Sequence, residues 1–93
     1  MKSVLQTDKK CYICGSTTGL HDHHIFPGNR RKWSEKYGLK CYLCYEHHEG
    51  NSGVHMNPNR GIDLELKQAA QVFYEVNIGT REDFIREFGK SYL

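Results

Sequence analysis

Two closely spaced cysteine pairs constrain this chain more than any other feature of its sequence. The first pair is Cys11 and Cys14, the second is Cys41 and Cys44, and both have the spacing C-x-x-C. All six histidines precede residue 56, and the rest of the chain contains neither histidine nor cysteine. Thiolate and imidazole groups are the preferred ligands of zinc, so a metal site explains this crowding better than packing does.

The size of the chain points in the same direction. A chain of 93 residues, of which 38% are hydrophobic, suits one small domain spanning residues 1–93, with a thin core. A domain this small usually needs disulfides or a metal for stability. The N-terminus lacks the apolar stretch of a signal peptide, and no run approaches the roughly 18 apolar residues of a membrane span. We therefore expect a reducing, cytoplasmic compartment and no membrane partner, which favours a metal over disulfides.

Two sets of four ligands can close a zinc site in this chain. The first set consists of all four cysteines. The second set replaces Cys41 with His47, because Cys44 and His47 have the same spacing as a C-x-x-C knuckle. The local pattern does not decide between them. Cys41 is either a ligand or a small buried residue on a strand, which is a common place for a free cysteine.

The pattern around these ligands predicts a hairpin and a short helix. Residues 1–10 are expected to be a polar lead-in. Residues 19–26 and residues 38–43 are expected to be strands that can pair with each other, and a short helix is expected from Tyr45. Between the strands, residues 29–36 are expected to form a basic loop. That loop carries Arg30, Arg31, Lys32 and Lys36, with Glu35 as its one acid.

The last third of the chain has a helical pattern. Apolar residues recur at intervals of three and four from Ile62 onward, which predicts an amphipathic helix whose stripe belongs to the core. Thr80 and Asp83 have the spacing of a helix N-cap with an acidic third position, which predicts a last helix. We therefore expect a metal-rich part in residues 11–56 and covering helices in residues 62–90.

The histidines outside the second ligand set can build another, open metal site. They are His23, His24, His48 and His55, and His21 is expected to be a surface or knuckle-side residue. Side chains alternate along a strand, so His23 and His24 point to opposite faces and can divide two tasks. A divalent ion stabilises the leaving oxygen in phosphodiester cleavage, and a neutral imidazole takes a proton from water.

Two segments of the chain resemble motifs of the HNH endonucleases. Residues 22–27 are Asp-His-His-Ile-Phe-Pro, and residues 43–48 are Leu-Cys-Tyr-Glu-His-His. Members of this family share a ββα-metal fold, a hairpin and a helix around one catalytic ion, and many carry a structural zinc knuckle. The resemblance covers residues 11–56. The chain is most similar to short phage or prophage members, with the phage recombination-enhancement, RecA-dependent nuclease group as one candidate.

The resemblance implies a fold and a set of site residues. The fold is a small, zinc-stabilised α+β domain with a ββα-metal motif and C-terminal helices. The ligands of the structural zinc are Cys11, Cys14, Cys44 and His47. His24 is the general base, and His23 and His48 hold the catalytic ion. His55 is expected either to fold back as a third ligand or to contact a phosphate.

The chain departs from the family at one position. Many members place an asparagine at the start of the second strand, where it orients the base, and this chain has Tyr37-Gly38-Leu39 there. Either Asn29, Asn51 or a backbone carbonyl then orients His24, or the enzyme is slow. The catalytic ion is expected to be Mg²⁺, Mn²⁺, Zn²⁺ or Ni²⁺, and imidazole ligands disfavour Mg²⁺, which prefers oxygen.

The function that follows is metal-dependent nicking or cleavage of DNA in a bacterial cytoplasm. The formal net charge is only +2, but positive charge gathers in the segment with Arg30, Arg31, Lys32 and Lys36, which are expected to contact DNA phosphates. Trp33 is expected to pack under the hairpin. Part of the apolar stripe on the C-terminal helices could form the contact of a homodimer. The alternatives are an inactive zinc-binding phage module that contacts DNA or a protein, and an enzyme that cleaves RNA.

Overall fold

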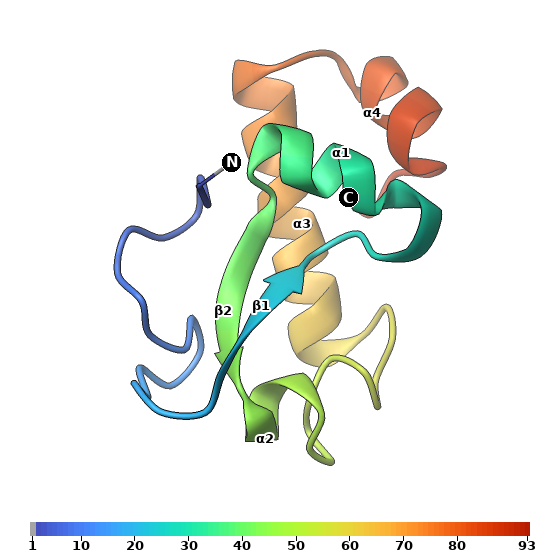
Figure 1. The fold of residues 1–93 in the computed structure, drawn as a ribbon. Helices are drawn as coiled ribbons and strands as arrows, with labels where there is room; N and C mark the ends of the chain where they lie inside the picture. The colour runs from blue at the N-terminus through green and yellow to red at the C-terminus, as the bar shows by residue number, and fades with distance from the viewer. Residues whose placement is uncertain (1) are drawn as a thin grey trace.

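The central feature of the fold is a two-stranded antiparallel sheet (Figure 1). The structure is a computed structural model and describes residues 2–93. Strand β1 is Leu20–His24 and strand β2 is Lys40–Cys44, with His23 opposite Cys41 in the register. Strand β2 leads directly into the short helix α2, Tyr45–His48. These elements confirm the predicted hairpin and the short helix after it, in a small α+β fold.

The expectation of a basic loop between the strands is wrong, because that segment is helical. It forms a 3-10 turn, Gly28–Arg30, and helix α1, Arg31–Tyr37. Buried Ser34 bonds to both backbone groups of Phe26 at 3.0 Å, which ties α1 to the end of β1. Trp33 stacks on Tyr37, four residues on, with ring centroids 6.1 Å apart, and packs against the core. Three basic residues of the segment, Arg31, Lys32 and Lys36, are exposed on α1.

Two helices, α3 (Gly61–Asn77) and α4 (Arg81–Phe88), complete the chain. Helix α3 runs behind the hairpin, and α4 lies near α1 at one end of the molecule (Figure 1). The predicted N-cap of α4 is confirmed: Thr80 and Asp83 exchange hydrogen bonds as a capping box. No helix within residues 2–93 combines the length and the apolar character needed to cross a membrane.

Aromatic side chains fill the core between the hairpin, α1 and the two last helices. Phe84 is fully buried, and its ring lies 4.7 Å from that of Phe88 and 5.5 Å from that of Phe26. Tyr37 and Tyr74 reach the same cluster, and the hydroxyl groups of both donate to the carboxylate of Glu87. The predicted covering role of the C-terminal helices is therefore performed mainly by aromatic rings.

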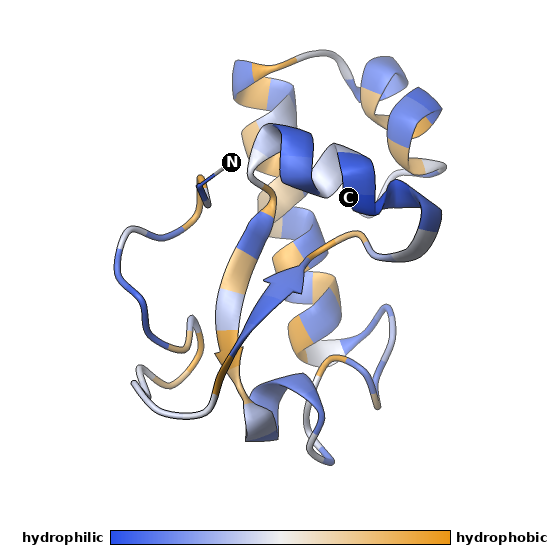
Figure 2. Ribbon diagram, in the orientation of Figure 1, coloured by the Kyte–Doolittle hydropathy of each residue, from blue (hydrophilic) through white to orange (hydrophobic). Residues whose placement is uncertain are grey.

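The buried face of α3 is more polar than the predicted apolar stripe. Leu66 is buried as expected, but the same face also buries Asp63, Lys67 and Gln71. Lys67 and Asp63 form an ion pair with 2.9 Å between Nζ and Oδ2. Figure 2 shows the mixture as alternating hydrophilic and hydrophobic residues along α3. An ion pair in this position satisfies both charges where burial would otherwise be costly.

The N-terminal segment lies along the free edge of β2, although its sequence indicates only a polar lead-in. The hydroxyl of Ser3 donates to the carbonyl of Lys40 at 2.5 Å. The backbone amide of Tyr42 donates to the side-chain oxygen of Gln6, also at 2.5 Å, and its carbonyl accepts from the amide of Tyr12 at 2.9 Å. An uncovered strand edge invites pairing with another chain, and these contacts block it.

Candidate metal centres

The predicted knuckle residues converge at one end of the hairpin. They are Cys11, Cys14, Cys44 and His47, and their ligand atoms all lie within 4.8 Å of one another. The Nδ1 atom of His47 is 3.2 Å from the sulfur of Cys44 and 3.6 Å from that of Cys11. The sulfurs of Cys14 and Cys44 are 3.8 Å apart. A tetrahedral zinc places such ligands about 3.3–3.8 Å apart, so this cluster could hold a structural metal ion.

The two buried cysteines of the chain have opposite acid–base character. Cys41 lies outside the cluster on β2, and burial raises the pKa of its thiol to about 12. Burial also raises the pKa of Cys11, but hydrogen bonds from the backbone at Cys14 and Cys44 outweigh it, and the pKa falls to about 6. The thiolate is the form that binds a metal, so the lowered pKa of Cys11 favours ligation, whereas Cys41 lies outside the cluster.

A second cluster consists of His23 on β1, His48 on α2 and His55 in the loop after α2. The ligand atoms of these three residues lie within 4.8 Å of one another, and the Nε2 atoms of His48 and His55 are 3.0 Å apart. His23 is 5% exposed, and its Nε2 is the one buried side-chain nitrogen or oxygen in residues 2–93 without a hydrogen-bond partner. Such an atom costs about 1–3 kcal/mol, and a metal ion would offset that cost.

The surroundings of His23 favour its neutral form, which is the form that binds metals. Burial lowers the pKa of His23 to about 3, with further lowering by the positive charge that His48 and His55 carry when protonated. Burial also lowers the pKa of His48. Three imidazoles facing one another are a suitable donor set for zinc, nickel or another ion that prefers nitrogen.

The loop after α2 folds back and brings His55 to the cluster. The backbone amide of His55 donates to the carbonyl of His48 at 3.1 Å, and that of Val54 donates to the carbonyl of His47 at 3.0 Å. The fold-back needs a glycine at position 53, because a Cβ atom there would lie 2.8 Å from the carbonyl carbon of His48. Of the two expected positions for His55, the structure places it beside His48, as an additional member of the donor set.

His24 lies on the opposite face of β1 from His23, as the alternation of the strand predicts. Its Nε2 atom is 2.9 Å from Oε1 of Glu35 on α1, and the same oxygen accepts from Lys40 at 3.1 Å. Glu35, and not Asn29 or Asn51, is thus the residue placed against the predicted base. The sequence carried a signal for it, because Glu35 is the one acid in the basic segment between the strands.

His21, expected to be a surface or knuckle-side residue, lies against α2 and the residue that follows it. It lies two positions before His23 on β1 and therefore on the same face. Its Nδ1 is 2.7 Å from Nδ1 of His48 and 3.8 Å from Oε2 of Glu49. The period of two along the strand would have indicated this neighbourhood, if the helix had been known to lie against that face.

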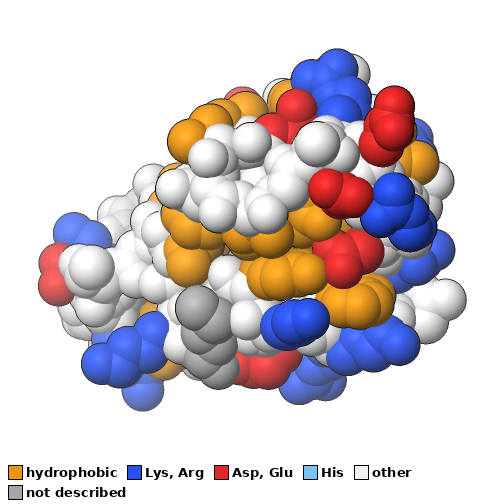
Figure 3. Space-filling view, turned by 90° about the horizontal axis from the view of Figure 1, so that it is seen from above, with side chains coloured by type: hydrophobic (Ala, Val, Ile, Leu, Met, Phe, Trp, Pro, Cys, Tyr) orange, Lys and Arg blue, Asp and Glu red, His pale blue; other side chains and the backbone are white. Residues whose placement is uncertain are grey.

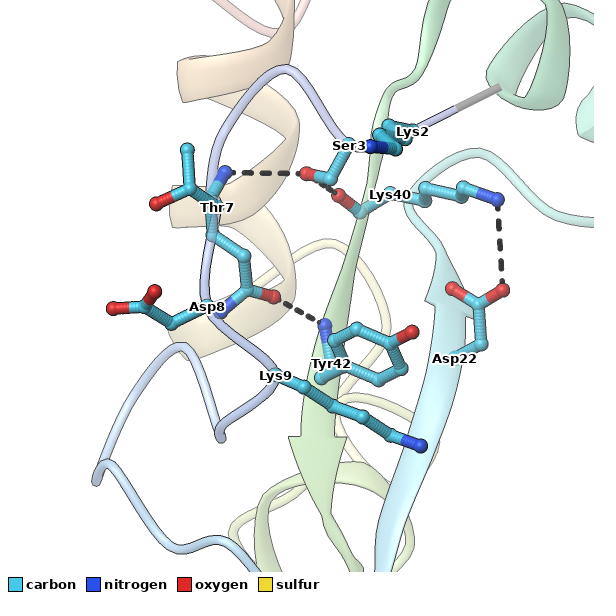
Figure 4. Close-up of a pocket in the computed structure, with 9 residues that line it drawn as sticks. Lys2, Ser3, Thr7, Asp8, Lys9, Asp22, Lys40 and Tyr42 are labelled. Atoms are coloured by element: carbon cyan, nitrogen blue, oxygen red, sulfur yellow. Dashed lines mark hydrogen bonds and ion pairs between the residues drawn. The ribbon is translucent and has the colours of Figure 1, made fainter.

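A hollow of about 620 Å³ lies on the His24 side of the hairpin, between the N-terminal segment and the outer strand face (Figure 4). Its lining includes Lys2, Lys9, Lys40, Asp22 and Tyr42. The Nζ atom of Lys9 lies 5.6 Å from the centre of the Tyr42 ring. Three lysines and two aspartates line the hollow, and Asp22 pairs with Lys40 at 3.6 Å. The hollow shares its strand face with His24 rather than with the three-histidine cluster.

The predicted phosphate-binding residues differ in their surroundings. Arg30 donates to the backbone carbonyl of Glu87 at 2.8 Å, so its guanidinium is partly used within the fold. Arg31, Lys32 and Lys36 are exposed. At the end of the molecule seen in Figure 3, positive and negative side chains are interspersed, with hydrophobic side chains between them. Positive charge on this face is therefore distributed in small groups.

Comparison of the chain with protein-family models, curated proteins and solved structures found no match. The resemblance of residues 22–27 and 43–48 to HNH endonucleases therefore stays a prediction. The arrangement of the two clusters, of His24 and of the basic side chains is the basis for the function proposed below.

Proposed function

We propose that the chain is a metal-dependent endonuclease of the HNH type that nicks or cleaves DNA. The observation that carries the proposal is the buried, unpartnered Nε2 of His23, which lies in a cluster with His48 and His55. The next residue, His24, points to the other strand face and contacts a carboxylate. Hydrolysis of a phosphodiester needs a metal ion and a base, and here a metal-ligand cluster and a histidine that can act as a base use adjacent positions of β1.

Zinc is the proposed ion of the knuckle, in a structural role. Three thiols and one imidazole, spaced for a tetrahedron, form a closed set with no position left for substrate. The knuckle joins the N-terminal segment to the end of β2 and to α2. Zinc bound there stabilises the hairpin on which the second cluster depends.

The ion of the second cluster is proposed to be Zn²⁺, Mn²⁺ or Ni²⁺ in preference to Mg²⁺, since the donors are imidazoles. When bound, it would stabilise the negative charge that develops on the leaving 3′ oxygen. Of the three ligands, His23 is fixed by burial, whereas His55 is exposed and belongs to a loop. The open side of the site is therefore the side of His55.

His24 is proposed to remove the proton from the attacking water. A neutral imidazole that contacts a carboxylate through Nε2 keeps its proton on that nitrogen, which leaves Nδ1 as the acceptor. Glu35 thereby fixes the tautomer of His24 and stabilises the imidazolium that forms when Nδ1 takes the proton. Glu35 performs the orienting role that an asparagine has in many members of the family.

The basic side chains near His24 are proposed to hold the DNA backbone. Lys9 and Lys40 line the hollow on the same strand face, and Arg31, Lys32 and Lys36 are exposed on α1. Contacts of this kind bind phosphates without reading the base sequence. Affinity for DNA is then expected to fall steeply as the salt concentration rises.

The proposal is tested by nicking of supercoiled plasmid with EDTA, Mg²⁺, Mn²⁺, Zn²⁺ and Ni²⁺ compared. A matched pair of variants on α2 reports on the ion: His48→Ala removes a ligand, and Tyr45→Ala removes a side chain that is 61% exposed and outside the cluster. We expect metal-dependent nicking that is lost in His48→Ala and kept in Tyr45→Ala.

Absence of cleavage with every ion would reject the nuclease. If the inactive protein still held a metal in its knuckle and shifted DNA in a gel, we would conclude that it is a DNA-binding module and not an enzyme. A parallel reaction with a structured RNA tests which nucleic acid is the substrate. Faster cleavage of RNA than of DNA would identify RNA as the substrate, with the same site residues.

A further inference from the structure

The imidazole of His48 is shared between two groups of donor atoms. Its Nε2 atom is 3.0 Å from Nε2 of His55, within the three-histidine cluster. Its Nδ1 atom, on the other side of the ring, is 2.7 Å from Nδ1 of His21. Glu49 completes the second group, with its Oε2 3.8 Å from Nδ1 of His21. A histidine ring binds one metal through its unprotonated nitrogen, and it binds a second one through the other nitrogen when the N–H proton is lost. Here each nitrogen faces its own set of donors.

The second group has the composition of a metal site. Two imidazole nitrogens and one carboxylate oxygen lie within 4.8 Å of one another, and they come from β1, α2 and the residue after α2. This mixture of nitrogen and oxygen donors is common for zinc and related ions that do chemistry or are exchanged, because a position is left for water.

Access to the second group is open. The side chain of His21 is 36% exposed and that of Glu49 is 49% exposed. An ion can therefore reach these atoms without any opening of the fold, and water can fill its remaining position. His23, in contrast, is buried on the same face of β1, so the two groups differ in exposure although they share His48.

We infer that His21, His48 and Glu49 form a second exchangeable metal site, so that the ring of His48 bridges two ions at the end of the hairpin as an imidazolate, with its N–H proton released to water. The ion is of the class that prefers nitrogen, such as Zn²⁺, Ni²⁺ or Cu²⁺. Together with the knuckle, the chain then holds three ions. The inference rests on the proposed use of His48 Nε2 by the three-histidine cluster, but it does not require that the chain cleaves DNA.

The test is a count of zinc ions per chain by native mass spectrometry, after loading with Zn²⁺ and removal of unbound ions. The variants are His21→Ala, Glu49→Gln and, as a matched control, His24→Ala, which removes a histidine from the same strand but from its other face. Glu49→Gln keeps the shape of the side chain and guards against a loss caused by unfolding of His21→Ala.

We expect three zinc ions in the wild-type chain and in His24→Ala, and two in His21→Ala. Glu49→Gln should lose the same ion at a lower concentration of chelator than the wild type. The inference is overturned if the wild-type chain holds two ions, or if His21→Ala holds as many as the wild type. The ions are counted without DNA, so this measurement tests the second site independently of cleavage. A chain that holds three ions but shows no nicking activity would reject the nuclease and support the second metal site.

Discussion

Substitution of Cys11 and of Cys41 by alanine can separate the contribution of the metal site to stability from the contribution of ordinary packing. Both side chains are 1% exposed, but only Cys11 belongs to the metal cluster. Cys41→Ala removes one buried sulfur, and the lost burial and the small cavity cost about 1 kcal/mol. In a domain of this size, that cost lowers the melting temperature by about 4–8 °C.

Cys11→Ala removes the same atom and a metal ligand with it. Binding of a structural zinc contributes about 10–16 kcal/mol in small domains, whereas a whole domain is stable by about 5–15 kcal/mol. The free energy lost with zinc binding, when one of the four ligands is removed, is therefore larger than the stability that the thin core can supply. We expect Cys41→Ala to keep the knuckle zinc and to melt cooperatively, and Cys11→Ala to lose that zinc and its cooperative transition.

The assay combines thermal unfolding, followed by circular dichroism, with the zinc content of each purified variant. Addition of a strong chelator to the wild-type chain should reproduce the behaviour of Cys11→Ala. Equal melting temperatures and equal zinc contents for the two variants would refute the assignment of the knuckle. So would a chain whose melting temperature does not change when its metal is removed.

Three further predictions concern other parts of the fold. Glu35→Gln should slow nicking by about 10–100-fold with the metal content unchanged, because His24 loses its carboxylate partner. Burial and Glu87 raise the pKa of Tyr37 to about 12 and favour its neutral form. The stability that this provides is complete below about pH 10 and is lost as the pH rises toward 12, so absorbance at high pH should show Tyr37 ionising together with unfolding. Gly53→Ala should displace the loop that carries His55, because the added Cβ atom would clash with the backbone of His48. Chelator competition should then show weaker binding of the ion at the three-histidine cluster, with the knuckle ion kept in place.

The hairpin and the two candidate ligand sets could be predicted because they depend on local spacing, and the resemblance to HNH endonucleases chose between the two sets. The knuckle residues lie three positions apart within each pair, and a period of two along β1 separates His23 from His24. The capping box at Thr80 is likewise a local signal. Local signals of this kind need no knowledge of which distant segments meet, and the structure bears out the convergence of the knuckle, the hairpin and the cap.

The remaining features depend on contacts between distant parts of the chain. Helix α1 was mistaken for a loop because its charges concealed the spacing of Trp33, Ser34 and Tyr37, which pack inward. The N-terminal segment has no strand pattern, since it covers the edge of β2 largely through the side chains of Ser3 and Gln6. The neighbours of His21 and His24 come from α2 and α1. No short sequence motif predicts how those helices pack against the hairpin.

The most direct test of the central claim is chemical rescue of His24→Ala by imidazole. The variant is loaded with metal, its ion content is shown to match the wild type, and single-turnover nicking is measured with and without added imidazole. Loss of a general base should slow nicking by about 10²–10⁴-fold, and imidazole should restore part of the rate in proportion to its neutral form. His48→Ala, which lacks an ion ligand, should not be rescued. A fully loaded His24→Ala chain that nicks DNA as fast as the wild type would contradict the role of His24.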